Sequence, residues 1–182
     1  MRLKVFEIID ETVDLLENDR PFYESCLEDI RRLLRWMLGK GNEMVMEVRG
    51  RIKGSESLRE KIIRNRFSMK YDHAEDILSS LSDLIGVSIE CRFIHEESEL
   101  LAQLRKVLSA SDADGYWFHP EYPQLRTDIR SQQPQIQKNG FSIYRIDGRY
   151  SREGRCVNVE LQIKSLVDTF WGEIEHKLVY KN

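Results

Sequence analysis

The sequence predicts an α+β fold in which a mixed β-sheet of about five strands is flanked by helices. Apolar residues recur every three or four positions over several stretches, as in amphipathic helices, and alternate with polar residues over shorter stretches, as in half-buried strands. The predicted strands interleave with helices, but a hairpin precedes the last strand, so the sheet is expected to be mixed. At 182 residues the chain fits one domain with a substantial core.

Residues 3–38 predict two consecutive helices. Their apolar residues recur at helical intervals, and the run Asn18-Asp19-Arg20-Pro21 interrupts them. Pro21 suits the first turn of the second helix, where its missing N–H costs nothing. Gly39 and Gly41 then end the pair. We therefore divide a single domain of residues 1–182 into an N-terminal helical segment, 1–42, and a core, 43–182.

The next part of the chain predicts strands and helices in alternation. Met44, Met46 and Val48 alternate with polar residues, so a short strand leads into a basic helix. A clearer strand follows, because apolar and polar residues alternate over its whole length. The expected ranges are 56–66 and 74–84 for two helices, 87–93 for the strand and 96–110 for a third helix.

Residues 111–138 predict a long loop, because the stretch is polar and contains Pro120, Pro123 and Pro134. Asn139-Gly140 is a turn signal and precedes a strand-like run. The remaining expectations are a strand over 141–146, a hairpin turn over 148–154, a strand over 157–163 and a helix over 165–180.

The composition excludes several classes of protein. A formal net charge of −3 argues against a general nucleic-acid binder, which is usually basic. The three cysteines show neither paired spacing nor a zinc pattern, as expected for reduced thiols. No apolar run approaches the roughly 18 residues of a membrane span, and the N-terminus lacks signal-peptide architecture. We expect a cytoplasmic protein whose partners include neither DNA nor a membrane.

One segment departs from this acidic balance. Residues 47–70 hold eight cations and three acids, and within them lies the run RIKGSESLREKIIR, residues 51–64. In a helix that starts near Ser55, positions 57, 61 and 64 share one face, and an extended segment before the helix points positions 51 and 53 the same way. The convergent side chains are those of Arg51, Lys53, Ser57, Lys61 and Arg64. A hydroxyl and four cations aimed at one volume suit a polyphosphate.

This segment also has a plainer interpretation. Basic residues on an amphipathic helix usually form a solvated face with exposed ion pairs, such as Glu60 with Arg64. Two carboxylates help to decide between a phosphate site and a solvated helix face. Asp83 lies where one predicted strand begins, and Glu160 lies on the polar face of another predicted strand. Carboxylates beside a phosphate site are suited to Mg²⁺, although most exposed carboxylates are merely solvated.

Three stretches resemble the synthetase domain of the RelA/SpoT family, the enzymes that make the alarmones ppGpp and pppGpp. They are RIKGSESLREKIIR, the run DLIGVSI at residues 83–89, and VELQIKSLVDTFWGEIEHKLVYK at residues 159–181. The resemblance covers about residues 47–181, and it implies a nucleotidyltransferase-like synthetase fold. The His-Asp metal hydrolase segment of the long family members does not precede the domain, so the chain resembles a small, stand-alone synthetase.

The resemblance implies a reaction and a site. The family transfers the β,γ-pyrophosphate of ATP to the ribose 3′-hydroxyl of GDP or GTP and releases AMP. The convergent basic residues would then hold the ATP phosphates, and Asp83 matches the Mg²⁺ ligand. Glu160 matches the carboxylate that helps with the metal and takes the 3′-hydroxyl proton. The acceptor nucleotide would be bound by Lys138, Asn139, Phe141, Arg145 and Gln162.

The acceptor half departs from the family pattern. Where the family reads N-G-Y-x-S-x-H, this chain has Phe141, Ile143 and Arg145 in place of the tyrosine, the serine and the histidine. Phe141 still offers an aromatic face for a base. Ser88 stands where the family usually has an arginine, and Lys164 keeps the charge of an arginine without its fork-shaped donor.

Three hypotheses therefore remain open. The chain makes (p)ppGpp with a retuned acceptor pocket; or it pyrophosphorylates another acceptor, such as another nucleotide or the 3′ end of tRNA; or it is a weakly active or inactive nucleotide-binding relative. Small relatives of this type are often tetramers, so a homo-oligomer is one expected partner state, which the sequence does not decide.

Overall fold

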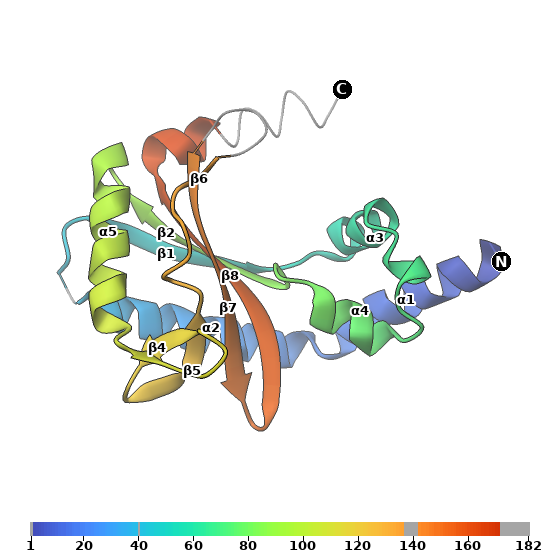
Figure 1. The fold of residues 1–182 in the computed structure, drawn as a ribbon. Coiled ribbons are helices and arrows are strands. Elements are labelled where there is room, and N and C mark those ends of the chain that lie inside the picture. The colour runs from blue at the N-terminus through green and yellow to red at the C-terminus, as the bar shows by residue number, and fades with distance from the viewer. Residues whose placement is uncertain (1, 40, 137–141, 172–182) are drawn as a thin grey trace.

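In the computed structural model the chain forms a mixed β-sheet with helices against one face and a helical lobe beside one end (Figure 1). The structure describes residues 2–39, 41–136 and 142–171. The α+β class is confirmed. Within the described ranges the sheet has eight strands, more than the five or so that the sequence predicts.

The two best-predicted strands lie side by side in the centre of the sheet. The main strand order is β1-β2-β8-β7-β5-β4-β3, and β6 pairs with one end of β7. β2 and β8 are parallel, whereas the other described pairs are antiparallel. The strands are β1 (Val45–Ile52), β2 (Ile85–Cys91), β3 (Ala110–Ser111), β4 (Trp117–His119), β5 (Tyr122–Thr127), β6 (Gln135–Ile136), β7 (Ser142–Arg152) and β8 (Arg155–Ser165).

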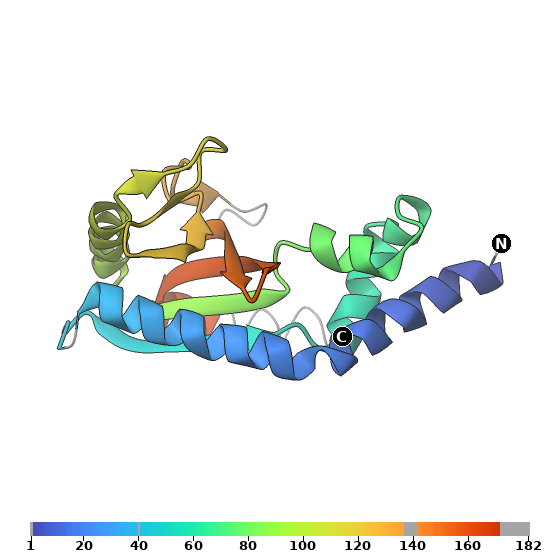
Figure 2. The same cartoon turned by 90° about the horizontal axis from the view of Figure 1, so that it is seen from below.

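The helices form two groups. α2 and α5 pack against the sheet, and α1, α3, α4 and a short 3₁₀ turn pack on one another to form the helical lobe (Figures 1 and 2). α1 runs directly into α2, with Pro21 in the first turn of α2 as predicted. The bounds are α1 (Arg2–Asn18), α2 (Arg20–Leu38), α3 (Ser55–Arg64), the 3₁₀ turn (Phe67–Met69), α4 (Ala74–Ser80) and α5 (Ile94–Val107).

Strand alternation separates a buried face of the sheet from a polar one. In β2 and β8 the apolar residues Val87, Ile89, Leu161 and Ile163 are buried, and the residues between them carry polar side chains. On the buried face α2 approaches β1 so closely that a Cβ at Gly50 would lie 2.3 Å from a methyl carbon of Leu27. The polar side chains therefore gather on the opposite face, which α2 and α5 leave open.

The predicted loop over residues 111–138 is wrong. That stretch contributes β4, β5 and β6 and the second residue of β3, and it buries Leu125, Thr127 and Ile129 fully. Strands of two or three residues are too short to show a period of two, so the sequence pattern misses them. Pro123 is tolerated in β5 because it lies outside the residues that pair with β7.

Several predicted boundaries shift. The helix expected over 74–84 ends at residue 80, and the one expected over 96–110 runs over residues 94–107. The hairpin turn expected over 148–154 is confined to Glu153 and Gly154, both with positive φ, because β7 and β8 pair as far as Arg152 and Arg155. Of the helix expected over 165–180, only residues up to 171 are described. In the described part of the chain, no helix is long and apolar enough to cross a membrane.

Candidate functional site

The open face of the sheet carries four of the predicted site residues in two adjacent rows. In the first row, Arg51 of β1 lies opposite Gly86 of β2, which lies opposite Glu160 of β8. Arg51 extends over Gly86, since a Cβ there would lie 3.6 Å from Arg51 Cγ. The second row brings Arg145 opposite Gln162. Paired residues point to the same face, so the register alone assembles a mixed cationic and acidic surface.

Asp83 is held by two lysines of the basic segment. Lys53 Nζ and Lys61 Nζ each donate a hydrogen bond of 2.7 Å to a different carboxylate oxygen of Asp83. All three side chains are largely buried, with exposed fractions of 11%, 17% and 23% for Lys53, Lys61 and Asp83. Burial by itself raises the pKa of Asp83, but the two lysine hydrogen bonds outweigh it and the pKa lies below its usual value. Lys53 and Lys61 therefore converge on one group, which is the carboxylate of Asp83, and their predicted role in binding phosphate stays a prediction.

Glu160 has both carboxylate oxygens engaged. Gln162 donates a hydrogen bond of 2.6 Å to Oε1, and Arg145 Nε lies 2.9 Å from Oε2. The Arg145 contact is an ion pair without hydrogen-bond geometry, because the buried Nε–H has no acceptor in line. Only 13% of the Glu160 side chain is exposed. The structure thus brings two predicted site residues, Arg145 and Gln162, to the carboxylate of a third, Glu160.

Sequence reasoning missed four residues that surround Arg145. Its guanidinium lies 3.2 Å from Ser82 Oγ and 3.4 Å from Asp147 Oδ1. Its backbone N–H donates to Gln133 Oε1, and its carbonyl accepts hydrogen bonds from the side-chain amides of Gln133 and Gln135. Asp147 was accessible to prediction, since it lies two residues from Arg145 in a strand. The glutamines were not, because they fall in the segment expected to be a loop.

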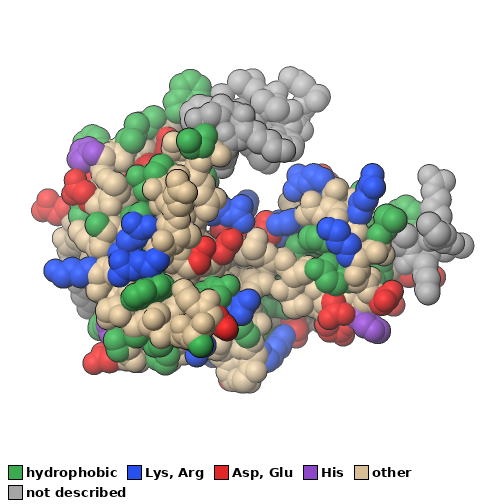
Figure 3. Space-filling model, viewed as in Figure 1, with side chains coloured by type: hydrophobic (Ala, Val, Ile, Leu, Met, Phe, Trp, Pro, Cys, Tyr) green, Lys and Arg blue, Asp and Glu red, His purple; other side chains and the backbone are tan. Residues whose placement is uncertain are grey.

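Of the five side chains predicted to converge, the two not yet placed, Ser57 and Arg64, lie on the helical lobe. Ser57 and Arg64 are both exposed on α3, which also carries Lys61. Lys and Arg side chains gather on this lobe, and the surface is hollowed between the lobe and the acidic side chains of the sheet (Figure 3). The fold therefore presents cations from β1 and α3 to the same side of the sheet.

Part of the predicted acceptor site falls outside the described residues. Lys138, Asn139 and Phe141 lie there, so their predicted roles stay predictions. Of the positions that depart from the family pattern, Ser88 is half-buried and lies opposite Gln162 in the register of the sheet. Ile143 pairs with Gln135 of β6.

The two predicted metal ligands are of the type that a hard divalent cation prefers. Mg²⁺ commonly binds one or two protein carboxylates together with waters, and it binds more tightly when substrate phosphates complete its ligands; Asp83 and Glu160 are the carboxylates predicted for this role. Among the described residues, no group of three or more His, Cys, Asp or Glu side chains is arranged to hold a metal ion. Each carboxylate is also paired with cations of the chain, so a metal that binds there would compete electrostatically with Lys53, Lys61 or Arg145.

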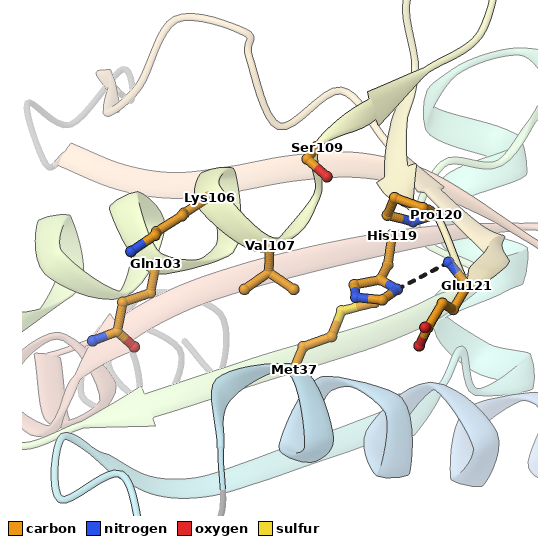
Figure 4. Close-up of a pocket in the computed structure, with 8 residues that line it drawn as sticks. All are labelled: Met37, Gln103, Lys106, Val107, Ser109, His119, Pro120 and Glu121. Atoms are coloured by element: carbon orange, nitrogen blue, oxygen red, sulfur yellow. Dashed lines mark hydrogen bonds between the residues drawn. The ribbon is translucent and has the colours of Figure 1, made fainter.

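Among the cavities that the described residues form, two illustrate the surroundings of the site. One of about 640 Å³ lies between the ends of α2 and α5 and the β4–β5 turn, where His119 Nδ1 accepts a hydrogen bond of 3.2 Å from the backbone N–H of Glu121 (Figure 4). Its lining contains none of the predicted site residues. The other, of about 620 Å³, is bordered by Ser82 and Asp147, the two side chains that flank the guanidinium of Arg145. Only the second adjoins the candidate site.

Comparison with known proteins assigns the chain to a family. A family profile described as "Region found in RelA / SpoT proteins" matches residues 50–182. The chain belongs to the RelA/SpoT family. The matched region begins in β1 beside Arg51 and includes Asp83 and Glu160, so the site described above lies within the part that defines the family. The resemblance of the sequence motifs to this family is confirmed.

RelA/SpoT relatives share the fold at low sequence identity. GTP pyrophosphokinase YwaC of Bacillus subtilis (strain 168) is 21% identical over 143 residues, which is 78% of this chain and 61% of YwaC. Small alarmone synthetase 1 from Bacillus subtilis superposes with a TM-score of 0.66 at 22% identity, over 92% of this chain and 80% of the synthetase. A GTP pyrophosphokinase family protein from Streptococcus pneumoniae gives 0.56 at 21% identity, over 100% of this chain and 79% of that one. The chain thus spans about three fifths of the curated relative, and the structural likeness establishes the fold.

Proposed function

We propose that this chain is a nucleotide pyrophosphokinase that transfers the β,γ-pyrophosphate of ATP to the ribose 3′-hydroxyl of GDP or GTP, which yields (p)ppGpp. The observation that carries the proposal is the arrangement of Lys53 and Lys61 around Asp83, beside the row that joins Arg51 to Glu160. A solved structure of small alarmone synthetase 1 bound to its product pppGpp, with a TM-score of 0.64 and 21% identity over 91% of this chain and 81% of the synthetase, supports a nucleotide ligand for this fold.

The basic segment would bind the donor. Phosphate oxygens are stronger partners for lysine than a single carboxylate, because a triphosphate carries several negative charges. Lys53 and Lys61 would leave Asp83 for the phosphates, while Arg51, Ser57 and Arg64 complete the cationic surface from β1 and α3. Mg²⁺ held by Asp83 and Glu160 would neutralise charge that develops on the transferring phosphates.

Glu160 would act on the acceptor. The 3′-oxygen attacks the β-phosphorus, the bond between that phosphorus and the oxygen bridging it to the α-phosphate breaks, and AMP departs with the bridging oxygen. The hydroxyl proton passes to the Glu160 carboxylate, which lies opposite Gly86 in the same row as Arg51. Arg51 extends over Gly86, the residue opposite Glu160, so donor and acceptor would approach each other along this row.

A second candidate function has one observation in its favour. In the family motif a histidine stands where this chain has Arg145, and the guanidinium of Arg145 contacts Glu160. A different group at the point of acceptor activation favours an altered acceptor, such as another nucleotide or the 3′ end of tRNA. The donor half of the proposal is the same in both cases.

The experiment is a transfer assay with ATP labelled at the γ-phosphate. Purified protein, Mg²⁺ and labelled ATP are incubated with GDP, GTP, other nucleotides or tRNA, and the products are separated by chromatography. We expect a labelled pentaphosphate or tetraphosphate of guanosine, with AMP formed in equal amount. Label transferred only to tRNA or to another nucleotide would favour the second candidate. The absence of any acceptor-dependent label transfer would contradict the proposal.

A further inference from the structure

We infer that Arg145 is a positioning residue that keeps Glu160 inactive in the free site and releases it to an anionic acceptor. The inference rests on the proposed function, because it concerns the carboxylate that activates the attacking hydroxyl. Both oxygens of Glu160 have a partner: Gln162 donates to Oε1 at 2.6 Å, and Arg145 Nε lies 2.9 Å from Oε2. The guanidinium beside Oε2 repels an incoming metal ion and obstructs the approach of a hydroxyl to that oxygen, so Glu160 becomes fully accessible only when Arg145 moves away.

The contact with Arg145 is the one that can be exchanged. Gln162 is adjacent to Glu160 on the same strand face and makes a directed hydrogen bond, whereas Arg145 Nε lacks hydrogen-bond geometry toward the carboxylate. The guanidinium has only two further neighbours among the described side chains, Ser82 Oγ at 3.2 Å and Asp147 Oδ1 at 3.4 Å. A phosphate can offer two parallel acceptors to a guanidinium, which the present contacts do not.

The surroundings hold the backbone of Arg145 in place while the side chain moves. Gln133 and Gln135 engage its backbone N–H and C=O, although β5 pairs with β7 only farther along the strand. The side chain is 36% exposed, and its neighbours Ser82 and Asp147 border the cavity of about 620 Å³. The Glu160 side chain is only 13% exposed, so the guanidinium is the more accessible of the two groups to an anion in solution.

This arrangement would protect the donor from water. If Glu160 were free whenever ATP is bound, it could deprotonate water, whose oxygen would attack the β-phosphorus; AMP would leave and pyrophosphate would be released. With Arg145 in place, the proton acceptor becomes available only when the acceptor phosphate has drawn the guanidinium away. Transfer to the nucleotide is then favoured over hydrolysis, because the ion pair between Arg145 and Glu160 opens only after the acceptor has bound.

The first test measures Mn²⁺ binding by water-proton relaxation in nucleotide-free protein, so it does not depend on activity. Arg145→Gln removes the charge, Arg145→Lys retains it, and Arg149→Gln removes an exposed arginine four residues away on the same strand. We expect Arg145→Gln to tighten Mn²⁺ binding at least tenfold, with little change in the other two. In a Glu160→Gln background the same substitution should have no effect, because no carboxylate is released. Two results would overturn the inference: Mn²⁺ affinity that is unchanged in Arg145→Gln, or an equal increase in Mn²⁺ affinity when Arg145→Gln is made in the Glu160→Gln background.

The second test measures AMP release from Mg²⁺-ATP without an acceptor. Arg145→Gln should hydrolyse ATP at least fivefold faster than the wild type, and Arg145→Lys should stay near the wild-type rate. GDP should accelerate AMP release by the wild type much more than uncharged guanosine, and the difference should shrink in Arg145→Gln. Slower AMP release by Arg145→Gln would mean that the guanidinium assists the chemistry, which contradicts the inference. If no variant transfers pyrophosphate, the proposed function fails and the Mn²⁺ measurements still decide the role of Arg145.

Discussion

Replacing Asp83 by asparagine should lower the folding stability of the ligand-free protein and raise its affinity for metal-free ATP. The asparagine side chain keeps the shape of the aspartate but not the charge that neutralises Lys53 and Lys61. Both lysines are at least four fifths buried, so their charges would lack a partner in the free state. In the wild type, by contrast, ATP without a metal must take the lysines from Asp83 and leave that carboxylate unpaired. The two effects therefore have opposite signs.

The contacts around Asp83 set the magnitude. Each hydrogen bond between charged groups contributes about 1.5 to 3 kcal/mol, and Asp83 accepts two of 2.7 Å. Partial exposure of Asp83 screens this sum, so we take about 2 kcal/mol as the cost of separating the carboxylate from its lysines. The substitution should then lower the melting temperature by about 4 to 8 °C. It should raise the affinity for metal-free ATP by about 30-fold, since about 1.4 kcal/mol corresponds to a factor of ten.

Isothermal titration calorimetry in EDTA measures the ATP affinity, and thermal unfolding followed by circular dichroism measures the stability. Asp72→Asn is the matched control, because Asp72 is an exposed aspartate between the 3₁₀ turn and α4. The stability difference also depends on pH. The pKa of Asp83 is lowered in the folded state, so its contribution is present above the unfolded pKa near 3.8 and is lost as the pH falls through the folded value.

One result would refute this reasoning. If Asp83→Asn bound metal-free ATP no more tightly than the wild type while Asp72→Asn behaved normally, Lys53 and Lys61 would not be exchanged between Asp83 and phosphate. A stable variant with weaker ATP binding would show that the lysines need the carboxylate to hold their positions. Either outcome would leave the basic segment as a structural ion-pair cluster.

Three further predictions concern other parts of the molecule. Glu160→Gln should lower pyrophosphate transfer at least 100-fold and leave the calorimetric ATP affinity within about threefold, because proton acceptance is lost and the donor contacts remain; a variant with near-wild-type turnover would contradict the assigned role. Burial raises the pKa of Glu97 to about 7, so the folded state retains a proton that the unfolded chain loses near pH 4.5. Stability should therefore fall by about 2 to 3 kcal/mol between pH 5 and 7, and Glu97→Gln should flatten that slope in thermal melts. Gly50→Ala places a Cβ 2.3 Å from a methyl of Leu27 and should cost about 1 to 3 kcal/mol in urea unfolding, whereas Gly54→Ala, with open space around it, should cost much less.

The sequence predicted the elements of the site better than their contacts. Alternation of apolar and polar residues located β2 and β8, and so placed Glu160 on a polar face. Helical spacing likewise assigned Lys61 to the same face of α3 as Ser57 and Arg64. Which carboxylate each cation meets depends on the strand register, and register is a long-range property that local spacing does not encode. For that reason the pairing of Lys53 with Asp83 and of Arg145 with Glu160 emerges only from the fold.

The predicted loop over residues 111–138 failed for a related reason. Its short strands depend on contacts that local patterns do not show. Leu125 is buried against β7, where it pairs with Tyr150, and within the stretch itself Trp117 lies under the guanidinium of Arg130 at 4.6 Å. Prolines and polar residues at a sheet edge look like loop composition when the partner strand is unknown. The glutamines that clamp the Arg145 backbone lie in this stretch. The surroundings of the acceptor site were therefore the part that local patterns described least well.

The charges of the site suggest why an arginine at position 145 has a different consequence from the histidine of the family motif. A histidine near neutral pH is charged only part of the time, so it would hold Glu160 intermittently. An arginine is always charged, and its ion pair with Glu160 persists until another anion competes for it. Asp83 likewise forms ion pairs with Lys53 and Lys61 that persist until another anion competes for the two lysines. Both carboxylates are thus neutralised by the chain itself. Under the proposed function, the ATP phosphates would draw the lysines away from Asp83, whereas the release of Glu160 would require an anion on the acceptor side, so catalysis would depend on both ligands being present.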